Sequence, residues 1–351
     1  MQKKSRWNGL TGLKKNKRVW LFVLLVSLLV YAFVPSGSFK GKKERILGAD
    51  ISFLPQLEDK GIKFTDKAGQ EDAIQILKNH GFNYIRLRIF NDPGADSGYS
   101  PKKAFCDLVH TKKMALRIKA SGMKFLLDFH YSDTWADPGK QFKPAAWKNL
   151  DFDHLQQAVR SYTRDVISAL KSQGTTPDMV QIGNEINHGM LWPDGSNAHP
   201  DTLAAFLKAG IAGVKEIDPS IRIMLHIACG GQNGESRSFI DNMLARHLEF
   251  DVIGESYYPQ WHGSLQQLQD NLNDLSARYK KDIVVVEYSR YKKEVNEIVF
   301  NLPGDRGIGT FIWEPLNTWE FIFDKKGQSN DSLINIYNDL SKRYKIPRAS
   351  F

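Results

Sequence analysis

The sequence predicts a (β/α)8 barrel, in which eight parallel strands close on themselves and helices cover the outside. Eight short apolar runs alternate with longer stretches of helical periodicity. Continuous apolar strands separated by helices are typical of a parallel sheet that is covered on its outer face. The alternative, an open doubly wound sheet, usually has a glycine-rich phosphate turn after its first strand. None is present here, so the barrel is favoured.

The elements follow one another regularly along the chain. Strands are predicted over residues 46–52, 83–90, 124–130, 179–185, 221–228, 251–258, 282–289 and 307–314. Helices are predicted over residues 70–80, 104–121, 153–173, 201–217, 236–248, 264–280, 291–300 and 330–344. Gly81, Gly122 and Gly174 each follow a helix directly, where a left-handed cap favours glycine. Asp201 is the predicted N-cap of its helix.

The N-terminal segment differs from the rest of the chain. Residues 1–45 contain eleven of the 48 Lys and Arg residues and one of the 39 acids, so the remainder has a net charge of −1. A nucleic-acid partner therefore loses its main support. Basic residues precede an apolar run over residues 19–34, which predicts a signal peptide or membrane anchor over residues 1–38. A basic linker (39–45) would then lead to one exported domain over residues 46–351.

Cysteine usage is low. Cys106 and Cys229 are separated by 123 positions and fall in different predicted elements, so two buried thiols are favoured over a disulfide. We expect a monomer that contacts a membrane only through its N-terminal segment, whether the domain is secreted, periplasmic or tethered.

Two carboxylates stand out where predicted strands end, which is where such barrels place their active sites. Glu185 ends the fourth strand and Glu287 ends the seventh. Strands three apart in a ring of eight face each other across its mouth, so these carboxylates can converge on one bond. Glycoside hydrolysis needs such a pair, with one member protonated and the other ionised.

Other strand-end residues suit a sugar substrate. Aromatic faces stack on sugar rings, while Arg, Asn and His bind hydroxyl groups. Arg86 could orient the ionised carboxylate, and Asn184 could hold the hydroxyl next to the reacting carbon. The predicted substrate-binding residues are Arg86, Arg88, His130, Trp135, Asn184, Tyr257, Tyr258 and Trp313.

Each residue also has a simpler interpretation. Glu185 alone could be a loop residue. Arg86 and Arg88 could form a salt-bridge layer inside the barrel, and Trp135 could be loop packing. For His226, a buried core histidine is the better interpretation. The joint occurrence of these residues at strand ends is what favours an active site.

Two specific runs, "HYSDTWADPGKQ" (130–141) and "GNEINHGMLWP" (183–193), resemble glycoside hydrolase family 53, the endo-β-1,4-galactanases of the retaining clan A. Further matching stretches cover nearly all of residues 46–345. The resemblance implies hydrolysis of β-1,4-galactan by Glu185 as acid/base and Glu287 as nucleophile, without a cofactor. It also implies support from Arg86, His130, Asn184, the tyrosines of the sixth strand and Trp313.

The chain departs from that family at Glu255, where an apolar residue is common, and over residues 288–291. We expect these departures to lie near the cleft and to bear on specificity. The segments after the seventh and eighth strands are short, so no calcium site is predicted. The alternatives are another clan A specificity (mannan, xylan or β-glucan), a non-catalytic glycan-binding barrel, and a metal-dependent hydrolase using His130, His226 and Asp50.

Overall fold

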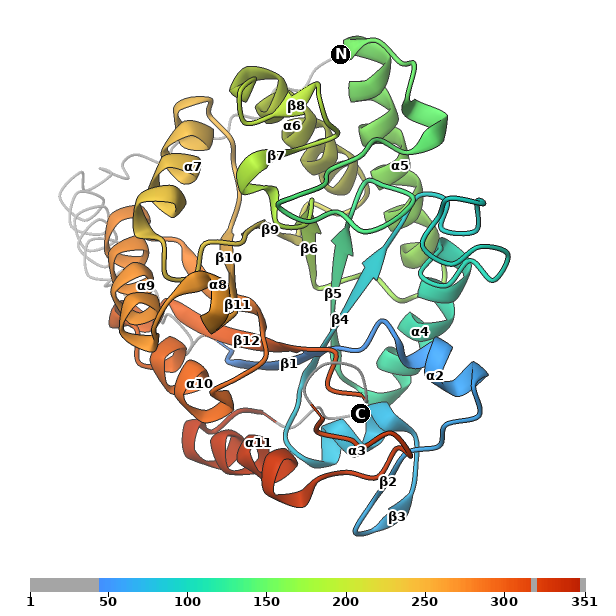
Figure 1. Ribbon diagram of the computed structural model, residues 1–351, viewed down its shortest axis with the longest axis vertical. Helices are drawn as coiled ribbons and strands as arrows, with labels where there is room; N and C mark the ends of the chain where they lie inside the picture. Colours follow the sequence, from blue (N-terminus) through green and yellow to red (C-terminus); the bar gives the residue numbers. More distant parts are fainter. Residues whose placement is uncertain (1–43, 317–320, 348–351) are drawn as a thin grey trace, which may run out of the picture. The chain divides into compact units, whose positions relative to one another are not determined.

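The computed structural model describes residues 44–316 and 321–347. These residues form a closed barrel of eight parallel strands surrounded by helices (Figure 1). The predicted segment over residues 1–38 and most of the linker lie outside the described residues. Within the described ranges, no helix is long and apolar enough to cross a membrane. The closed barrel of eight parallel strands confirms the predicted fold class.

The barrel strands lie where the sequence predicts them, and each stops one to three residues earlier. They are β1 (Ile46–Asp50), β4 (Tyr84–Ile89), β5 (Lys124–Phe129), β6 (Met179–Ile182), β9 (Arg222–Ile227), β10 (Val252–Tyr257), β11 (Asp282–Tyr288) and β12 (Gly307–Trp313). The order around the ring is β1-β12-β11-β10-β9-β6-β5-β4, and every neighbouring pair is parallel. Two antiparallel pairs were not predicted: β2 (Thr65–Asp66) with β3 (Gly69–Gln70), and β7 (Gly189–Met190) with β8 (Gly195–Ser196).

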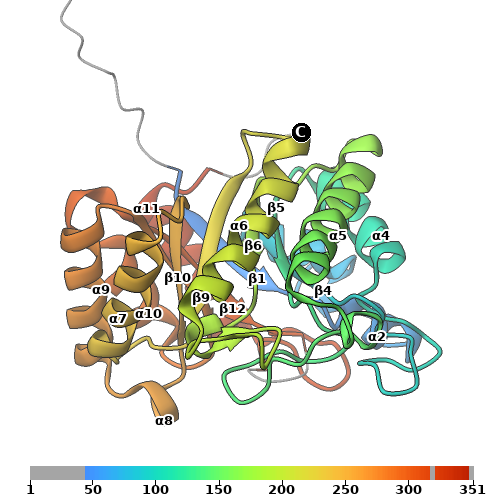
Figure 2. The same cartoon turned by 90° about the horizontal axis from the view of Figure 1, so that it is seen from above.

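Helices cover the outside of the barrel (Figure 2). The predicted ones are α3 (Ala73–Asn79), α4 (Leu108–Ser121), α5 (Phe152–Ser172), α6 (Pro200–Ile217), α7 (Asn233–Ala245), α9 (Leu265–Tyr279), α10 (Lys292–Phe300) and α11 (Asp331–Tyr344). The short helices α2 (Leu54–Asp59) and α8 (Pro259–His262) were not predicted. Asp201 is not an N-cap, because Pro200 already occupies the first helical position and His199 precedes it. Gly81, Gly122 and Gly174 do have positive φ.

The barrel interior is divided into an apolar layer and a polar layer. Alternate residues of a strand face opposite sides of the sheet. One buried cluster, separate from the main core, contains Ile46, Tyr84, Leu126, Met179, Met224, Val252, Val284, Val286, Ile308 and Phe311. Two residues further along four of these strands, the same face carries the buried side chains of Arg86, Asp128, Gln181 and His226. A polar layer therefore lies directly beneath the C-terminal mouth of the barrel.

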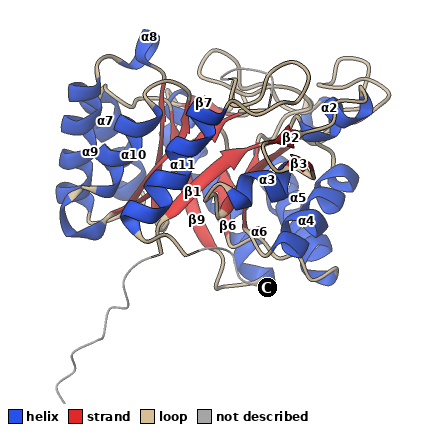
Figure 3. Cartoon of the chain, turned by 90° about the horizontal axis from the view of Figure 1, so that it is seen from below, coloured by secondary structure: helices blue, strands red, loops and turns tan. Residues whose placement is uncertain are grey.

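Connecting segments gather at that mouth, together with β7 and α8 (Figure 3). One of them depends on Gly189, which has φ +98°. A Cβ at this position would lie 2.1 Å from the carbonyl oxygen of Gly195, so only glycine lets β7 and β8 approach each other. These connections form the sides of the site described next.

Candidate active site

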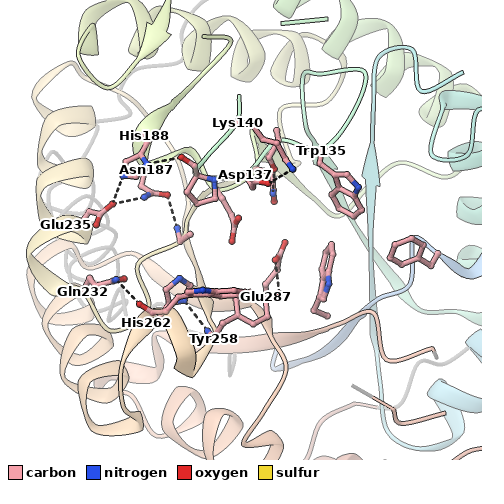
Figure 4. A pocket seen from close by; sticks show the side chains of 18 residues that line it. Trp135, Asp137, Lys140, Asn187, His188, Gln232, Glu235, Tyr258, His262 and Glu287 are labelled. Atoms are coloured by element: carbon pink, nitrogen blue, oxygen red, sulfur yellow. Dashed lines mark hydrogen bonds and ion pairs between the residues drawn. The ribbon is translucent and has the colours of Figure 1, made fainter. Parts of the chain in front are cut away.

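A cavity of about 600 Å³ opens at the C-terminal mouth of the barrel. Six residues singled out from the sequence line it: Trp135, Asn184, Glu185, Tyr258, Glu287 and Trp313. Side chains that the sequence did not single out also contribute, among them Phe53, Asn187, His188, Gln232, Glu235 and Trp261. Figure 4 shows Trp135 on one side of the cavity, His188 and Glu235 on the other, and Glu287 between them. The predicted pair of carboxylates therefore faces one shared space.

Glu287 reaches the cavity because β11 contains a β-bulge. Val286 belongs to the inner apolar cluster, so strict alternation would turn Glu287 outward, toward the helices. The register shifts at this point: Glu255 of β10 pairs with Val285, but the next residue, Ser256, pairs with Glu287. An extra residue of this kind re-aims the side chain that follows it. Glu287 consequently faces the barrel interior.

Hydrogen-bond donors hold both oxygens of the Glu287 carboxylate. Arg86 Nη1 donates to Oε1 at 2.7 Å, and the hydroxyl of Tyr258 donates to Oε2 at 3.1 Å. Burial raises the pKa of Glu287 to about 7, because the guanidinium of Arg86 offsets the effect of burial only in part. Burial and the nearby carboxylates raise the pKa of Tyr258 well above its usual value, so this phenol remains a donor. The arrangement suits an ionised carboxylate.

Arg86 is the centre of the polar layer. It is fully buried and also bonds to Asp50 at 2.9 Å and to Asp128 at 2.8 Å. Burial opposes the ionisation of Asp128, yet Arg86 and then His130 hold the pKa of this carboxyl below its usual value. The interior salt-bridge layer suggested by the sequence therefore exists, and Glu287 is one of its members.

Glu185 has a different environment. Its backbone has φ 48° and ψ 54°, in the left-handed region that non-glycine residues rarely adopt and that is often found at functional sites. Its Oε1 atom accepts a 2.6 Å hydrogen bond from Ser256 Oγ. Burial raises the pKa of Glu185, and the negative charge of Glu287 raises it further. Of the two carboxyls, Glu185 thus has the stronger tendency to retain a proton.

Asn184 and His130 are fixed beside this pair. Asn184 Oδ1 accepts a hydrogen bond from Arg86 Nη2 at 3.0 Å, and its Nδ2 donates to the carbonyl of Ala136 at 2.9 Å. His130 Nδ1 accepts from the backbone N–H of Ala136 at 3.2 Å, while Nε2 lies 3.0 Å from Asp128. Both side chains are therefore oriented by the polar layer and by one loop.

Arg88 does not line the cavity, although it was predicted to bind substrate. It is 1% exposed and donates to Glu314 at 2.6 Å. Four aromatic rings lie within 5.4 Å of its guanidinium carbon: those of Phe53, Tyr99, Trp135 and Trp313. Three of these rings also line the cavity. Arg88 thus supports the aromatic side of the cavity from behind, through cation–π contacts.

Strand alternation also turns Tyr257 away from the cavity, because its neighbours on both sides face inward. Its hydroxyl donates to the carbonyl of Gly263 at 3.0 Å. Glu255 faces outward in the same way and accepts from Ser236 of α7 at 2.8 Å. Tyr288 bonds to Tyr337 of α11. The departures at Glu255 and Tyr288, expected near the cleft, therefore contact the surrounding helices instead.

The remaining predictions can be compared with the structure directly. Cys106 and Cys229 are both buried free thiols. His226 is fully buried, as expected for a core histidine. It nevertheless bonds to Ser256, which the sequence did not single out although both residues share the inward face of their strands. Among residues 44–316 and 321–347, no group of three or more His, Cys, Asp or Glu side chains could hold a metal ion.

The chain is similar in sequence to known glycoside hydrolases. Residues 46–296 match the profile of the family described as glycosyl hydrolase family 53. An "uncharacterized protein in bgaB 5'region" of Niallia circulans is 42% identical, over 82% of this chain and 92% of that protein. The arabinogalactan endo-beta-1,4-galactanase A of Aspergillus niger is 35% identical, over 76% of this chain and 84% of that enzyme.

Solved structures give a consistent result. A glycoside hydrolase family 53 catalytic domain of Ignisphaera aggregans superposes with a TM-score of 0.78 at 33% identity, covering 84% of this chain and 95% of that one. A fungal beta-1,4-galactanase superposes with a TM-score of 0.76 at 29% identity, covering 84% of this chain and 99% of that one. A family 10 xylanase at 13% identity has a TM-score of 0.55 and shares the fold alone.

Proposed function

The chain belongs to glycosyl hydrolase family 53 and is a glycoside hydrolase, and from this premise we propose that it is a retaining endo-β-1,4-galactanase. Its proposed substrate is the β-1,4-galactan of type I arabinogalactan, a side chain of pectin. The relatives named as galactanases support this choice of substrate. Glu185 is the proposed acid/base and Glu287 the proposed nucleophile.

One observation carries the proposal: two buried carboxyls line the same cavity, and only one of them, Glu287, contacts a guanidinium directly. Glu287 lies 2.7 Å from a buried guanidinium, which favours its charged form. Glu185 receives a neutral hydroxyl, and both its burial and the charge of Glu287 favour its protonated form. A pair with these two states at neutral pH is what acid-assisted displacement at an anomeric carbon requires.

The first step would form a covalent intermediate. The Glu287 carboxylate attacks the anomeric carbon while Glu185 gives its proton to the glycosidic oxygen, and the bond between that carbon and oxygen breaks. The leaving sugar departs with a new hydroxyl group. Once the charge on Glu287 is consumed in the ester, the pKa of Glu185 falls, because the second cause of its elevation has disappeared.

The second step would release the sugar. The ionised Glu185 takes a proton from a water molecule, whose oxygen attacks the anomeric carbon as the ester bond to Glu287 breaks. Glu287 returns as a carboxylate between Arg86 and Tyr258, and Glu185 is protonated again. Two displacements at one carbon retain its configuration.

The aromatic side of the cavity would hold the sugar chain. Trp135 and Trp313 lie with ring centroids 6.0 Å apart and line the space next to the carboxyls. Indole faces stack on the more apolar face of galactose, the one opposite its axial hydroxyl. Polar groups near the carboxyls bind the hydroxyl groups of the sugar. Cleavage within a chain requires sugar contacts on both sides of the pair.

The proposal is tested with the purified enzyme on a set of polysaccharides: β-1,4-galactan, mannan, xylan and β-glucan. We expect rapid loss of viscosity on galactan, short galacto-oligosaccharide products and, by NMR of fresh products, the β-anomer first. Cleavage of another polymer with galactan left intact would refute the substrate. Initial release of the α-anomer would refute the retaining mechanism.

We also propose that the domain over residues 46–351 acts outside the cytoplasm, because its polymeric substrate lies there. The domain is proposed to be a monomer. Support comes from the basic and apolar order of residues 1–38. Cell fractionation with N-terminal sequencing of the mature protein is the direct test. Full-length protein confined to the soluble cytoplasmic fraction would contradict export.

A further inference from the structure

Glu185, the proposed acid/base, is hydrogen-bonded to Ser256, which is in turn hydrogen-bonded to His226. Ser256 Oγ lies 2.6 Å from Glu185 Oε1 and 2.8 Å from His226 Nε2. Ser256 and His226 are both fully buried. A hydroxyl has one proton to donate. If Ser256 donates it to Glu185, its oxygen must accept from His226, and Nε2 of that histidine must carry the hydrogen.

The surroundings of His226 Nδ1 decide which nitrogen carries the hydrogen. Three groups face this atom: the side-chain Nε2 of Gln181 at 3.0 Å, the backbone N of Glu185 at 3.4 Å and Oδ1 of Asn184 at 3.0 Å. The backbone N–H of Glu185 can only donate, whereas Asn184 Oδ1 already accepts from Arg86 Nη2 at 3.0 Å. Nδ1 must therefore be the acceptor. Burial, followed by the nearby positive charge of Arg86, lowers the pKa of His226 well below its usual value, so the ring is neutral. A neutral ring with an acceptor Nδ1 is protonated at Nε2.

The amide orientation of Gln181 is fixed in turn by charged neighbours. Its Oε1 accepts from Arg86 Nε at 3.3 Å and from Arg86 Nη2 at 3.1 Å, and a guanidinium can only donate. Its Nε2 donates to Asp128 Oδ1 at 2.5 Å, and an ionised carboxylate can only accept. With the amide reversed, its NH2 group would face the guanidinium of Arg86 and its oxygen would face the carboxylate of Asp128, so that donor would meet donor and acceptor would meet acceptor. The amide nitrogen of Gln181 thus faces Asp128 and His226, and the carbonyl oxygen of Gly183 at 3.1 Å and Oδ1 of Asn184 at 3.2 Å are also within its reach.

We propose that Gln181, His226 and Ser256 form a hydrogen-bond relay, oriented by Arg86, that keeps Glu185 Oε1 as an acceptor and leaves Oε2 to carry the catalytic proton. This inference rests on the proposed role of Glu185. No residue of the relay touches the reacting atoms, so all three are positioning residues. One guanidinium would then organise both carboxyls: Glu287 by direct contact and Glu185 through three side chains.

The relay matters because the alternative proton arrangement is unproductive. If Ser256 donated to His226 instead, Glu185 would give its own proton to Ser256 and could not give it to the glycosidic oxygen. The relay also favours the ionised form of Glu185 by donating to it, as the second step requires. Other charged groups acting on Glu185 are Glu287 and Asp137, which raise its pKa, and Arg86, which lowers it.

The test compares two substrates of the purified full-length enzyme. Hydrolysis of galactotetraose requires a proton for the leaving oxygen, whereas dinitrophenyl β-galactobioside has a leaving group that requires none. Ser256→Ala is expected to lower kcat/KM for galactotetraose roughly 10- to 100-fold, because part of the rate enhancement from general acid catalysis is lost. For the dinitrophenyl substrate, kcat/KM should fall less than about threefold. The alkaline limb of its pH profile should move to higher pH, because a donor to the ionised carboxyl is lost.

Matched variants separate positioning from folding. Ser236→Ala removes another buried serine that donates to a buried glutamate, and it should leave both substrates unaffected. His226→Gln keeps an N–H group toward Ser256 and should retain most of the activity that His226→Leu loses. Equal losses on both substrates for Ser256→Ala, or an unmoved alkaline limb, would overturn the relay. An inactive parent enzyme, or full activity in Glu185→Gln, would instead overturn the proposed function.

Discussion

Glu185 and Glu255 have nearly the same surroundings on opposite sides of the barrel wall. Both are buried, and each accepts a serine hydroxyl, from Ser256 at 2.6 Å and from Ser236 at 2.8 Å. Burial is the largest cause of the raised pKa in both. Glu185, however, lines the cavity, and a second carboxylate raises its pKa further. Glu255 lies between β10 and the helices, where Cys229 and Asn271 also donate to it.

The difference shows that a buried carboxyl with a raised pKa is not sufficient evidence of catalysis. Burial between β10 and the helices raises the pKa of Glu255, and the hydrogen-bond donors around its carboxyl offset that effect only in part. What distinguishes Glu185 is access to a cavity and a partner carboxylate across it. We expect substitutions of cavity-facing residues to impair catalysis or substrate binding, and matched substitutions of helix-facing residues to leave both unchanged.

The largest effect is expected from Glu287→Gln. An amide cannot form the glycosyl ester, so kcat on galactan should fall on the order of 10⁴-fold or more. In Glu287→Ala, which vacates the space of the carboxylate, azide should partly restore turnover of an activated galactoside and give product of inverted configuration. Turnover close to that of the parent would show that Glu287 is not the nucleophile.

Glu185→Gln should come next, with a loss of about 10²- to 10⁴-fold in kcat/KM on galactan, since the leaving oxygen then receives no proton. Its matched control is Glu255→Gln, which makes the same substitution on the helix-facing side. We expect that control to stay within about twofold of the parent. A comparable loss in both variants would remove the distinction between the two glutamates.

A smaller effect on binding is expected for Trp135→Ala. Losing a stacking surface in the cavity wall should raise KM for galacto-oligosaccharides roughly tenfold, about 1.4 kcal/mol, with little change in kcat. Trp147 packs against Tyr162, with ring centroids 5.9 Å apart, and does not line the cavity. Trp147→Ala should therefore lower the thermal unfolding midpoint without changing KM. A rise in KM in the control would contradict the assignment of the aromatic wall.

The last effect concerns the dependence of stability on pH, with the smallest change expected in catalysis. In the folded state the pKa of Glu255 is raised to about 8, above its unfolded value of about 4.3. Its stabilising contribution is complete below the unfolded pKa and is lost as pH rises toward 8, by about 1.4 kcal/mol per pH unit. Glu255→Gln removes this dependence. In denaturant unfolding at pH 5, 6, 7 and 8, the free energy of unfolding of the parent should fall relative to that of Glu255→Gln as pH rises; parallel curves would exclude the effect.

The sequence predicted all eight barrel strands and the carboxylate pair, because apolar runs and their polar ends are local signals. It did not predict the bulge that turns Glu287 inward, since the one-residue shift depends on pairing with β10 rather than on the residues of β11. Simple alternation along β10 would have assigned Tyr257 to the outer face. Ser256 was missed because a lone serine carries no signal until its partners are placed in space.

The connections around the cavity are linked to one another by hydrogen bonds. Asn187, in the segment after β6, donates to Glu235 of α7 at 2.6 Å, and Asn184 donates to the carbonyl of Ala136, after β5, at 2.9 Å. A protein engineer who exchanges one connection would therefore need to exchange its partner with it. Linked segments recombined between related enzymes would change which polymer is held, while the polar layer beneath, which belongs to the strands, stays in place, and natural divergence has the same route open to it.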